Sequence, residues 1–225
     1  MRGQMSLKRL IITASVLLTT ASVSNIASAQ SKGAPGKFDF YVLALSWSPD
    51  YCAAKGDSDP SQCKGKKLDF VLHGLWPQYE KGYPANCTTE KLPSTVKQQF
   101  PNLFPSDKLY NHEWEKHGTC TGLTPTQYLT LSKQKKDSVT IPTNYIKPNK
   151  PFRTTINKLQ YDFVGANPAF TSQSIAPYCS GSGRFLQEIF VCFTKDGKPA
   201  SCSAEVIRRS QRSCGQPDFL VRSVR

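Results

Sequence analysis

The chain has 225 residues and only three histidines, all in two short segments. His73 closes an apolar run at residues 68–73, and His112 and His117 lie in residues 112–120. Imidazole exchanges a proton near neutral pH, so each histidine could act as a general acid, a general base or a metal ligand. A lone histidine at a strand end more often makes a structural hydrogen bond. The second segment therefore decides whether these residues do chemistry.

If that segment is helical, it gathers four ionisable side chains on one face. Successive residues turn by about 100°, so with His112 as the origin Lys116 lies at about 40°. Glu113 lies at about 100° and His117 at about 140°. Trp114 falls outside this arc, at about 200°, and is free to pack into a core. We interpret the face as a catalytic surface, because a solvated helix has little reason to collect these groups.

Zinc chemistry is the first alternative, because His112 and Glu113 match the start of the zinc motif H-E-x-x-H. The histidines of this chain are five residues apart, which on one helix separates the imidazoles by about 140°. They do not close easily on one ion, and Lys116 would place an ammonium group beside it. We expect no metal and no other cofactor. A metal-dependent nuclease or phosphoesterase is the rival interpretation.

Metal-free cleavage of RNA uses every member of the set. RNA carries its own nucleophile, the 2′-hydroxyl group, so an enzyme needs a base for that proton and an acid for the leaving 5′-oxygen. It also needs a positive charge for the phosphorane, which Lys116 supplies. Two imidazoles on opposite sides of the phosphate explain why His73 comes from a separate segment. The residue types predict phosphodiester cleavage in RNA.

The N-terminus and the charge indicate an exported, cationic protein. Residues 1–29 have a basic start, an apolar stretch and a small-residue ending, so we predict a signal peptide cleaved before Gln30. A transmembrane anchor is the alternative, but hydroxyl side chains interrupt the stretch. We predict a flexible lead-in at residues 30–36 and a single domain at residues 37–225. The mature chain has 26 basic and 16 acidic residues, which suits a polyanionic partner.

All eight cysteines follow the predicted signal peptide, and an even number in an exported chain predicts four disulfides. One pair is favoured locally: Cys192 and Cys202 flank residues 195–198, whose Asp-Gly step is typical of a tight hairpin turn. A zinc site is the alternative, but the sequence has no C-x-x-C pair. Local patterns leave the pairing of the other six open.

Strand-like and helical patterns do not alternate strictly along the chain. Strands are predicted at residues 38–47, 68–73 and 185–193, with Gly74 ending the second. Helices are predicted at residues 94–100, 110–117, 124–136 and 152–161, with Gly118 as a C-terminal stop. This order predicts an α+β domain with several helices around a largely antiparallel sheet.

The two histidine segments resemble the active-site motifs of the ribonuclease T2 family of secreted endoribonucleases. Residues 72–77, Leu-His-Gly-Leu-Trp-Pro, match the first motif, and residues 112–120, His-Glu-Trp-Glu-Lys-His-Gly-Thr-Cys, match the second. The likeness extends to the strand at residues 40–47, to Tyr51 and Cys52, and to the cysteine distribution. It implies an α+β fold and cleavage of single-stranded RNA through a 2′,3′-cyclic phosphate to a 3′-phosphate, without a cofactor.

The resemblance also implies a role for each residue of the set. His73 corresponds to the general acid, His117 to the general base and His112 to a phosphate-binding residue. Glu113 and Lys116 correspond to stabilisers of the transition state. The acid and the base exchange roles in the hydrolysis step, so the sequence leaves open which histidine acts first as the base.

A base-binding site and a disulfide pattern follow from the same resemblance. Trp76 matches a position that stacks on the base before the cut, although an ordinary core tryptophan is the alternative. Gln78 stands where some members carry an aspartate that favours adenine, which leaves the base preference open. Tyr83 is included from aromatic spacing alone. The expected disulfides are Cys52–Cys63, Cys87–Cys120, Cys179–Cys214 and Cys192–Cys202.

The main rival from another class is a non-enzymatic cationic protein that binds RNA or an anionic surface. It explains the charge and the export equally well, but not why two imidazoles, a glutamate and a lysine are disposed for proton transfer. We expect a monomer that is secreted or periplasmic and binds single-stranded RNA, with no metal and no membrane.

Overall fold

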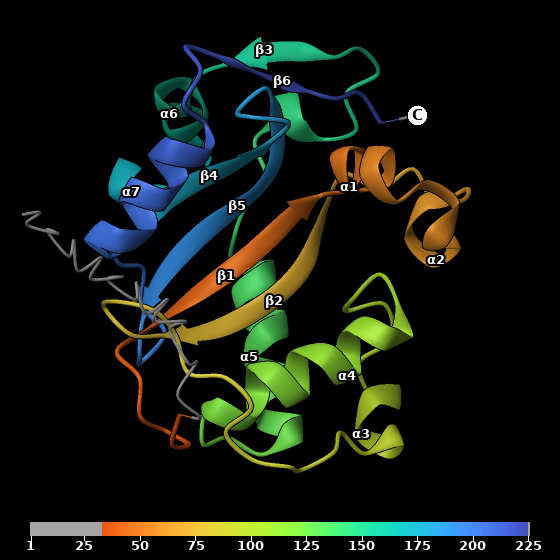
Figure 1. The fold of residues 1–225 in the computed structure, drawn as a ribbon, viewed down its shortest axis with the longest axis vertical. Coiled ribbons are helices and arrows are strands. Elements are labelled where there is room, and N and C mark those ends of the chain that lie inside the picture. The colour runs from red at the N-terminus through yellow and green to blue at the C-terminus, as the bar shows by residue number, and fades with distance from the viewer. Residues whose placement is uncertain (1–32, 225) are drawn as a thin grey trace, which may run out of the picture.

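A six-stranded sheet forms the centre of the computed structural model, which describes residues 33–224. The predicted signal peptide at residues 1–29 lies outside the described residues, as do residues 30–32 of the lead-in. The strands follow the order β2-β1-β5-β6-β3, with β4 paired to β5 (Figure 1). They are β1 (Phe40–Trp47), β2 (Phe70–Gln78), β3 (Phe152–Thr154), β4 (Ile175–Ser180), β5 (Phe185–Thr194) and β6 (Phe219–Val221).

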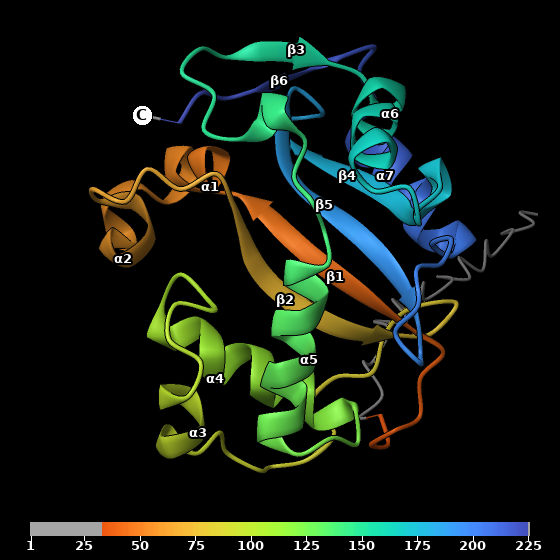
Figure 2. The same ribbon diagram turned by 180° about the vertical axis from the view of Figure 1, so that it is seen from behind.

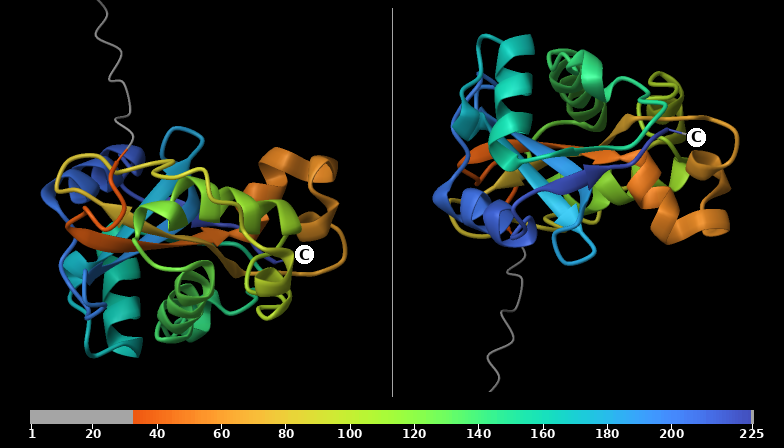
Figure 3. Two further views of the ribbon diagram at one scale, coloured as in Figure 1. Left: turned by 90° about the horizontal axis from the view of Figure 1, so that it is seen from below. Right: turned by 90° about the horizontal axis from the view of Figure 1, so that it is seen from above.

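Helices cover both faces of this sheet. Figures 2 and 3 show α5 and α6 against one face and α7 against the other, with α3 and α4 beyond the β2 edge. The helices are α1 (Ser48–Lys55), α2 (Pro60–Cys63), α3 (Ser94–Gln98), α4 (Asp107–Lys116), α5 (Pro125–Asp137), α6 (Ile156–Ala166) and α7 (Ala204–Ser213). All strand pairs except the short β5–β6 contact are antiparallel, which confirms the predicted α+β class. Within residues 33–224 no helix has the length and apolarity needed to cross a membrane.

Burial on both faces explains the continuous apolar run of β1. Leu43 and Leu45 pack into the larger core, to which α5 and α6 contribute, whereas Val42 and Ala44 pack into a smaller core that includes Val206 of α7. A strand covered on both sides loses the alternation of polar and apolar residues that one solvated face would impose. β1 is thus an interior strand between β5 and β2, and β2 is the edge strand that carries His73.

The edge strand β2 contains a β-bulge at His73. Ala44 of β1 pairs with Gly74, but the next residue, Leu45, pairs with Leu72, so His73 is the extra residue. The bulge also explains how Leu72 and Leu75, three residues apart, both enter the same core. A bulged residue is re-aimed relative to a regular pleat. The prediction that the strand ends at Gly74 is therefore wrong: β2 continues to Gln78 because the bulge absorbs the irregularity.

One further sequence prediction needs correction. The predicted helix at residues 152–161 is instead the short strand β3 followed by α6, which begins after its N-cap Thr155. β3 forms because residues 152–154 pair with β6, which lies near the C-terminus and more than 60 residues away, so local patterns do not reveal it. The helix predicted to stop at Gly118 does end there, since α4 ends at Lys116 with His117 as its C-cap, and Gly118 opens a 3₁₀ turn. A Cβ there would lie 2.4 Å from the ring of Trp114, so packing requires this glycine.

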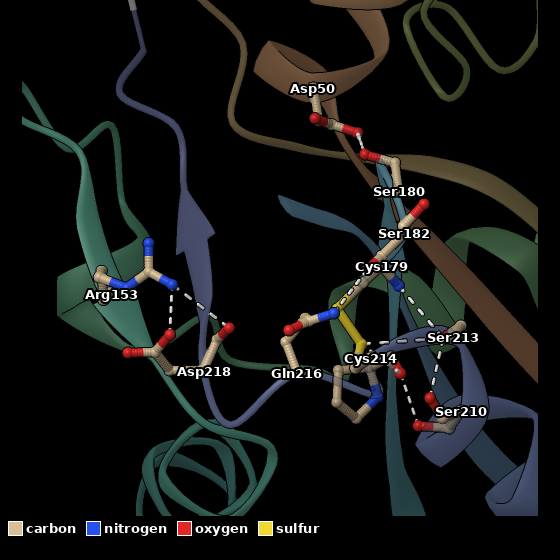
Figure 4. Close-up of a disulfide and its surroundings, with 11 residues drawn as sticks. Asp50, Arg153, Cys179, Ser180, Ser182, Ser210, Ser213, Cys214, Gln216 and Asp218 are labelled. Carbon is tan, nitrogen blue, oxygen red and sulfur yellow. Dashed lines mark hydrogen bonds and ion pairs between the residues drawn. A yellow bond between two sulfur atoms is a disulfide. The ribbon is translucent and has the colours of Figure 1, made fainter. Parts of the chain in front are cut away.

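Four disulfides are present, and their pairs are those that the family resemblance implies: Cys52–Cys63, Cys87–Cys120, Cys179–Cys214 and Cys192–Cys202. Cys179–Cys214 fastens the end of α7 to β4, beside the hydrogen bond between Ser180 and Asp50 (Figure 4). Cys192–Cys202 closes the predicted turn after β5, in which the backbone N–H of Gly197 donates to the carbonyl of Thr194.

Candidate active site

The bulge in β2 places His73 between two carboxyl groups. Its Nδ1 lies 3.2 Å from Oε2 of Glu188 on β5, and its Nε2 lies 3.9 Å from Oε1 of Glu113 on α4. The side chain of His73 is 36% exposed, whereas Glu188 is 12% exposed and Glu113 is fully buried. His73 is therefore anchored at one ring nitrogen and presents the other toward α4.

Glu113 is buried because β2 passes close to it. Its Oε2 accepts a hydrogen bond of 2.6 Å from the indole Nε1 of Trp76, and Oε1 has no hydrogen-bond partner among residues 33–224. A Cβ on Gly74 would lie 1.9 Å from Oε2 of Glu113 and 2.2 Å from Nε1 of Trp76. Position 74 must therefore be glycine for this carboxyl group to enter. Burial raises the pKa of Glu113 to about 7, so the group is partly protonated at neutral pH.

Trp76 joins the two histidine segments. Its ring stacks on the imidazole of His117, with centroids 5.1 Å apart and planes at 28°, and it meets His73 edge-on at 5.0 Å. The ring is partly exposed, which argues against an ordinary core tryptophan. Tyr83, on the loop after β2, lies 5.9 Å from His117 between ring centroids. Both aromatic residues singled out for the site thus lie around His117.

Lys116 lies beside the imidazoles, with its Nζ 5.9 Å from the centroid of Tyr83. Burial and the charges of Lys116, His112 and His73 hold the pKa of His117 well below its usual value. The pKa of the exposed His112 is also lowered, by partial burial and the charges of Lys116 and His73. The predicted face of α4 therefore carries His112, Glu113, Lys116 and, at its C-cap, His117.

His73 and His117 have opposite electrostatic surroundings. Burial acts to lower the pKa of His73, but the hydrogen bond to Glu188 and the charges of Glu113 and Glu188 outweigh it and raise that pKa. The Nδ1 atom of His117 is buried and has no hydrogen-bond partner among the described residues. One imidazole is thus biased toward the protonated form and the other toward the neutral form, as an acid and a base require.

Gln78 does not lie among the side chains of the candidate site. It is buried at the end of β2, and its side-chain amide donates to the carbonyl of the adjacent Pro77. Trp114, in contrast, lies where the helical arc predicts, fully buried with its indole N–H donating to the carbonyl of Glu90. In residues 33–224 no three histidine, cysteine, aspartate or glutamate side chains converge as metal donors.

A sequence profile described as the Ribonuclease T2 family matches residues 38–202, which contain every side chain described above. The chain belongs to the ribonuclease T2 family. It is therefore an enzyme of the ribonuclease T2 type, as its two histidine segments predict. A relative named "Ribonuclease" from Aeromonas hydrophila is 39% identical over 97% of this chain and 100% of that protein. A "Probable ribonuclease" of Haemophilus influenzae is 27% identical over 77% of this chain and 64% of that protein.

Solved structures of ribonucleases share the fold. A point mutant of ribonuclease MC1, in complex with 5′-UMP, superposes with a TM-score of 0.65 and 19% identity, covering 81% of this chain and 97% of that chain. Ribonuclease NT in complex with 5′-AMP gives a TM-score of 0.55 and 22% identity, covering 74% of this chain and 91% of that one. The T2 fold of this chain therefore extends beyond the two motifs.

Glu188 is the residue of the site that the sequence analysis missed. It lies more than 100 positions from His73 and in no histidine segment, so local spacing gives no reason to select it. One signal was present: it is the only charged residue in β5, Phe-Leu-Gln-Glu-Ile-Phe-Val-Cys-Phe-Thr. A carboxylate in a strand this apolar needs a partner, and among the described residues that partner is His73.

Proposed function

We propose that this ribonuclease cleaves single-stranded RNA by metal-free transphosphorylation, with His117 as the first base and His73 as the acid. The observation that carries the proposal is the pair of imidazoles with opposite pKa shifts on two sides of Trp76. A neutral His117 suits removal of the 2′-hydroxyl proton, and a protonated His73 suits delivery of a proton to the leaving oxygen.

The first step breaks one P–O bond. His117 takes the proton of the 2′-hydroxyl group, the 2′-oxygen attacks phosphorus, and the bond from phosphorus to the 5′-oxygen breaks. His73 gives its proton to that 5′-oxygen, which leaves as a hydroxyl group. The products are a 2′,3′-cyclic phosphate and a new 5′-hydroxyl end, and the two histidines have exchanged protonation states.

The second step reverses these roles. His73 takes a proton from water, the hydroxide oxygen attacks phosphorus, and the bond to the 2′-oxygen breaks. His117 returns its proton to the 2′-oxygen. The product is a 3′-phosphate, and both histidines regain their starting states without an external proton source.

The charge on the phosphorane needs stabilisation from α4. Lys116 is the cation of this face, and its charge contributes to the lowered pKa of His117, so it acts within the site. The pKa of His112 is lowered, so this residue binds the phosphate as a hydrogen-bond donor. An ionised Glu113 would repel the phosphate. With a pKa of about 7 and a free Oε1, Glu113 takes up a proton near the anion and donates a hydrogen bond to a phosphoryl oxygen.

Trp76 and Tyr83 provide the aromatic surface beside His117 for the base before the cut. We propose that this aromatic surface sets the base preference, because the side-chain N–H of Gln78 already donates to the carbonyl of Pro77. We also propose export: the sequence of residues 1–29 predicts a signal peptide, and the four disulfides suit an oxidising compartment. A monomer is the proposed state.

The test compares purified mature protein on an RNA oligonucleotide and on its all-2′-deoxy analogue, each with excess chelator. We expect RNA cleavage that the chelator does not reduce, cyclic-phosphate ends by mass spectrometry, and no cleavage of the deoxy substrate. Cleavage of the deoxy oligonucleotide, or loss of activity with chelator, would contradict the mechanism. RNA binding without cleavage would favour the non-enzymatic alternative.

A further inference from the structure

Glu188 holds the ring nitrogen of His73 that faces away from α4. Its Oε2 lies 3.2 Å from Nδ1 of His73, and among residues 33–224 its carboxyl group makes no other hydrogen bond or ion pair. It reaches His73 across one strand: Ser46 of β1 pairs with Glu188 on one side and with Val71 of β2 on the other. The short side chain of Ser46 leaves the carboxyl group room on this row.

This contact fixes which nitrogen of His73 is available for catalysis. A carboxylate that accepts the Nδ1–H bond selects the ring orientation and leaves Nε2 for the reacting group. Nε2 is the atom that lies 3.9 Å from Glu113, on the side of α4. The charged groups around His73 are Glu188 from β5 and Glu113, Lys116, His112 and His117 from α4. Of the two carboxyl groups, Glu188 is the one that makes the hydrogen bond to His73, at Nδ1, whereas Oε1 of Glu113 lies 3.9 Å from Nε2.

We propose that Glu188 is a positioning residue, which orients His73 through Nδ1 and keeps it protonated as the acid of the first step. The inference rests on the proposed function for the catalytic use of His73. The contact itself is independent of that function, so the two can fail separately.

The test uses Glu188→Gln, which keeps the shape and a hydrogen-bond acceptor but removes the charge, and Glu188→Ala, which removes both. We expect the basic limb of the pH profile of kcat/KM to move to lower pH by about one unit in Glu188→Gln, with KM little changed. The loss should therefore be small at pH 6 and about tenfold at pH 8. Glu188→Ala should lose activity at every pH. Glu80→Gln removes an exposed carboxyl group and serves as the charge-matched control.

NMR titration of labelled histidine gives a readout that needs no catalysis. We expect the pKa of His73 to fall in Glu188→Gln and its Nδ1–H signal to persist, whereas Glu188→Ala loses the Nδ1–H signal. An unmoved His73 pKa together with an unmoved basic limb would overturn the proposal. A fallen pKa in a protein that does not cleave RNA would keep the contact and reject the proposed function.

A separate observation concerns a groove of about 850 Å³ that opens from His73 and His112. It runs between the α1–α2 segment and the first turns of α4, and Lys55 and Lys108 line it. Both lysines are exposed, and neither forms an ion pair within the described part of the chain. The groove therefore carries two lysines without an ion-pair partner next to the proposed acid.

The carboxylates of the same groove are already engaged. Asp59 accepts hydrogen bonds from the Tyr51 hydroxyl at 2.9 Å and from the backbone N–H of Gln62. Asp107 pairs with Lys97 at 3.0 Å. Asp107 is thus paired with a cation, and Asp59 keeps its charge but is held by two neutral donors. Lys55 and Lys108 are the cations of the groove that have no carboxylate partner among residues 33–224.

We infer that this groove binds the backbone phosphates of RNA downstream of the cut, through Lys55 and Lys108. The direction rests on the proposed function: His73 protonates the leaving 5′-oxygen, and His73 lines the groove, so the strand attached to that oxygen extends into it. Phosphate contacts of this kind add affinity without reading sequence.

The test compares a dinucleoside monophosphate, whose only phosphate is the one cleaved, with an RNA decamer. In Lys55→Ala/Lys108→Ala we expect kcat/KM on the decamer to fall about tenfold, with the dinucleotide changed less than about twofold. Lys150→Ala/Arg209→Ala removes two exposed cations outside the groove and is the control. Equal losses on both substrates, or the same loss in the control variant, would overturn the inference.

Binding of an all-2′-deoxy decamer, which cannot be cleaved by this mechanism, separates the groove from the chemistry. The slope of log Kd against log salt should become shallower by about 1.4 in the groove double variant, about 0.7 for each lost phosphate contact. A slope unchanged from that of the unmodified chain would reject the groove even if cleavage were affected. If the slope changes but no RNA is cleaved, the proposed function fails and the groove stands.

Discussion

At the residue scale, the buried Glu113 is the unusual feature of the site. A fully buried carboxyl group has a high pKa because burial disfavours its charge. In the proposed mechanism, that property turns a group that would repel phosphate into a hydrogen-bond donor. Its place depends on Trp76, which donates to one oxygen, and on Gly74, which leaves space for that oxygen. The position and the protonation of this carboxyl group therefore depend on α4, which carries it, and on two residues of β2.

Gly74→Ala tests this packing. The new Cβ would meet Oε2 of Glu113 at 1.9 Å, so the carboxyl group or the strand must shift. We expect kcat to fall by at least about 100-fold, because displacements of this size misalign reacting groups. Gly165→Ala in α6 has open space around the Cβ, and it should keep full activity. Near-normal kcat in Gly74→Ala would contradict the close packing described for Glu113.

The opposite shifts of His73 and His117 predict the pH profile of the first step. Activity needs a neutral His117, so it is lost as pH falls through the lowered pKa of that group. It needs a protonated His73, so it is lost as pH rises through the raised pKa of that group. The kcat/KM profile on a dinucleotide should be a broad bell around pH 6.5, the ordinary pKa of histidine. A narrow bell, with an acid limb above about pH 6.5, would contradict the assignment.

At the element scale, two irregularities bring the histidines together. The bulge in β2 redirects His73, and the end of α4 places His117 at a C-cap rather than on a regular helical turn. The loop that carries Tyr83 is attached to this helix end by the Cys87–Cys120 disulfide and by a hydrogen bond from the N–H of Asn86 to the carbonyl of Lys116. The site depends on how these elements meet.

Removal of single disulfides tests that dependence. Cys87–Cys120 and Cys179–Cys214 have sequence separations of 33 and 35, so chain entropy predicts a similar loss for each, about 3 to 4 kcal/mol. We expect both double serine variants to unfold at lower denaturant concentration. Only Cys87→Ser/Cys120→Ser should also lose kcat, by about tenfold or more, because it frees the loop of Tyr83 from α4. Equal kcat in the two variants would show that this disulfide does not align the site.

At the scale of the whole molecule, helices cover both faces of the sheet. The β2 edge pairs with no further strand, and its side chains contact α4. Side chains of β2 can therefore line the site, while the cores on the two faces of the sheet hold the strand in place. The cationic balance of the chain adds a long-range attraction for RNA. The disulfides add stability that suits a protein outside the reducing interior of a cell.

The proposed export can be tested on the 225-residue chain. We expect the full-length chain, expressed in a Gram-negative host, to be recovered from the periplasm with an intact mass that starts at Gln30. The cysteines should resist alkylation until a reductant is added. A product that keeps residues 1–29 and sediments with membranes would instead support the anchor interpretation.

The sequence determined much of this protein by short-range rules. Strand β1, helix α5 with its capping residue Thr124, and the face of α4 all follow from residue periodicity and local hydrogen bonds. The motifs around His73 and His112 were sufficient to indicate the family and the reaction. These features involve residues within a few positions of one another, so their physical causes are visible in a linear chain.

Only the tertiary structure decided the features that join distant residues. The short strand β3 exists because β6 pairs with it, the bulge at His73 exists because both Leu72 and Leu75 must enter one core, and Glu188 reaches His73 across β1. The opposite pKa shifts of His73 and His117 also arise there, since burial and neighbouring charge are properties of the folded site. The sequence named the histidines, and packing decided that the pKa of His73 is raised and that of His117 lowered, as the proposed acid and base require.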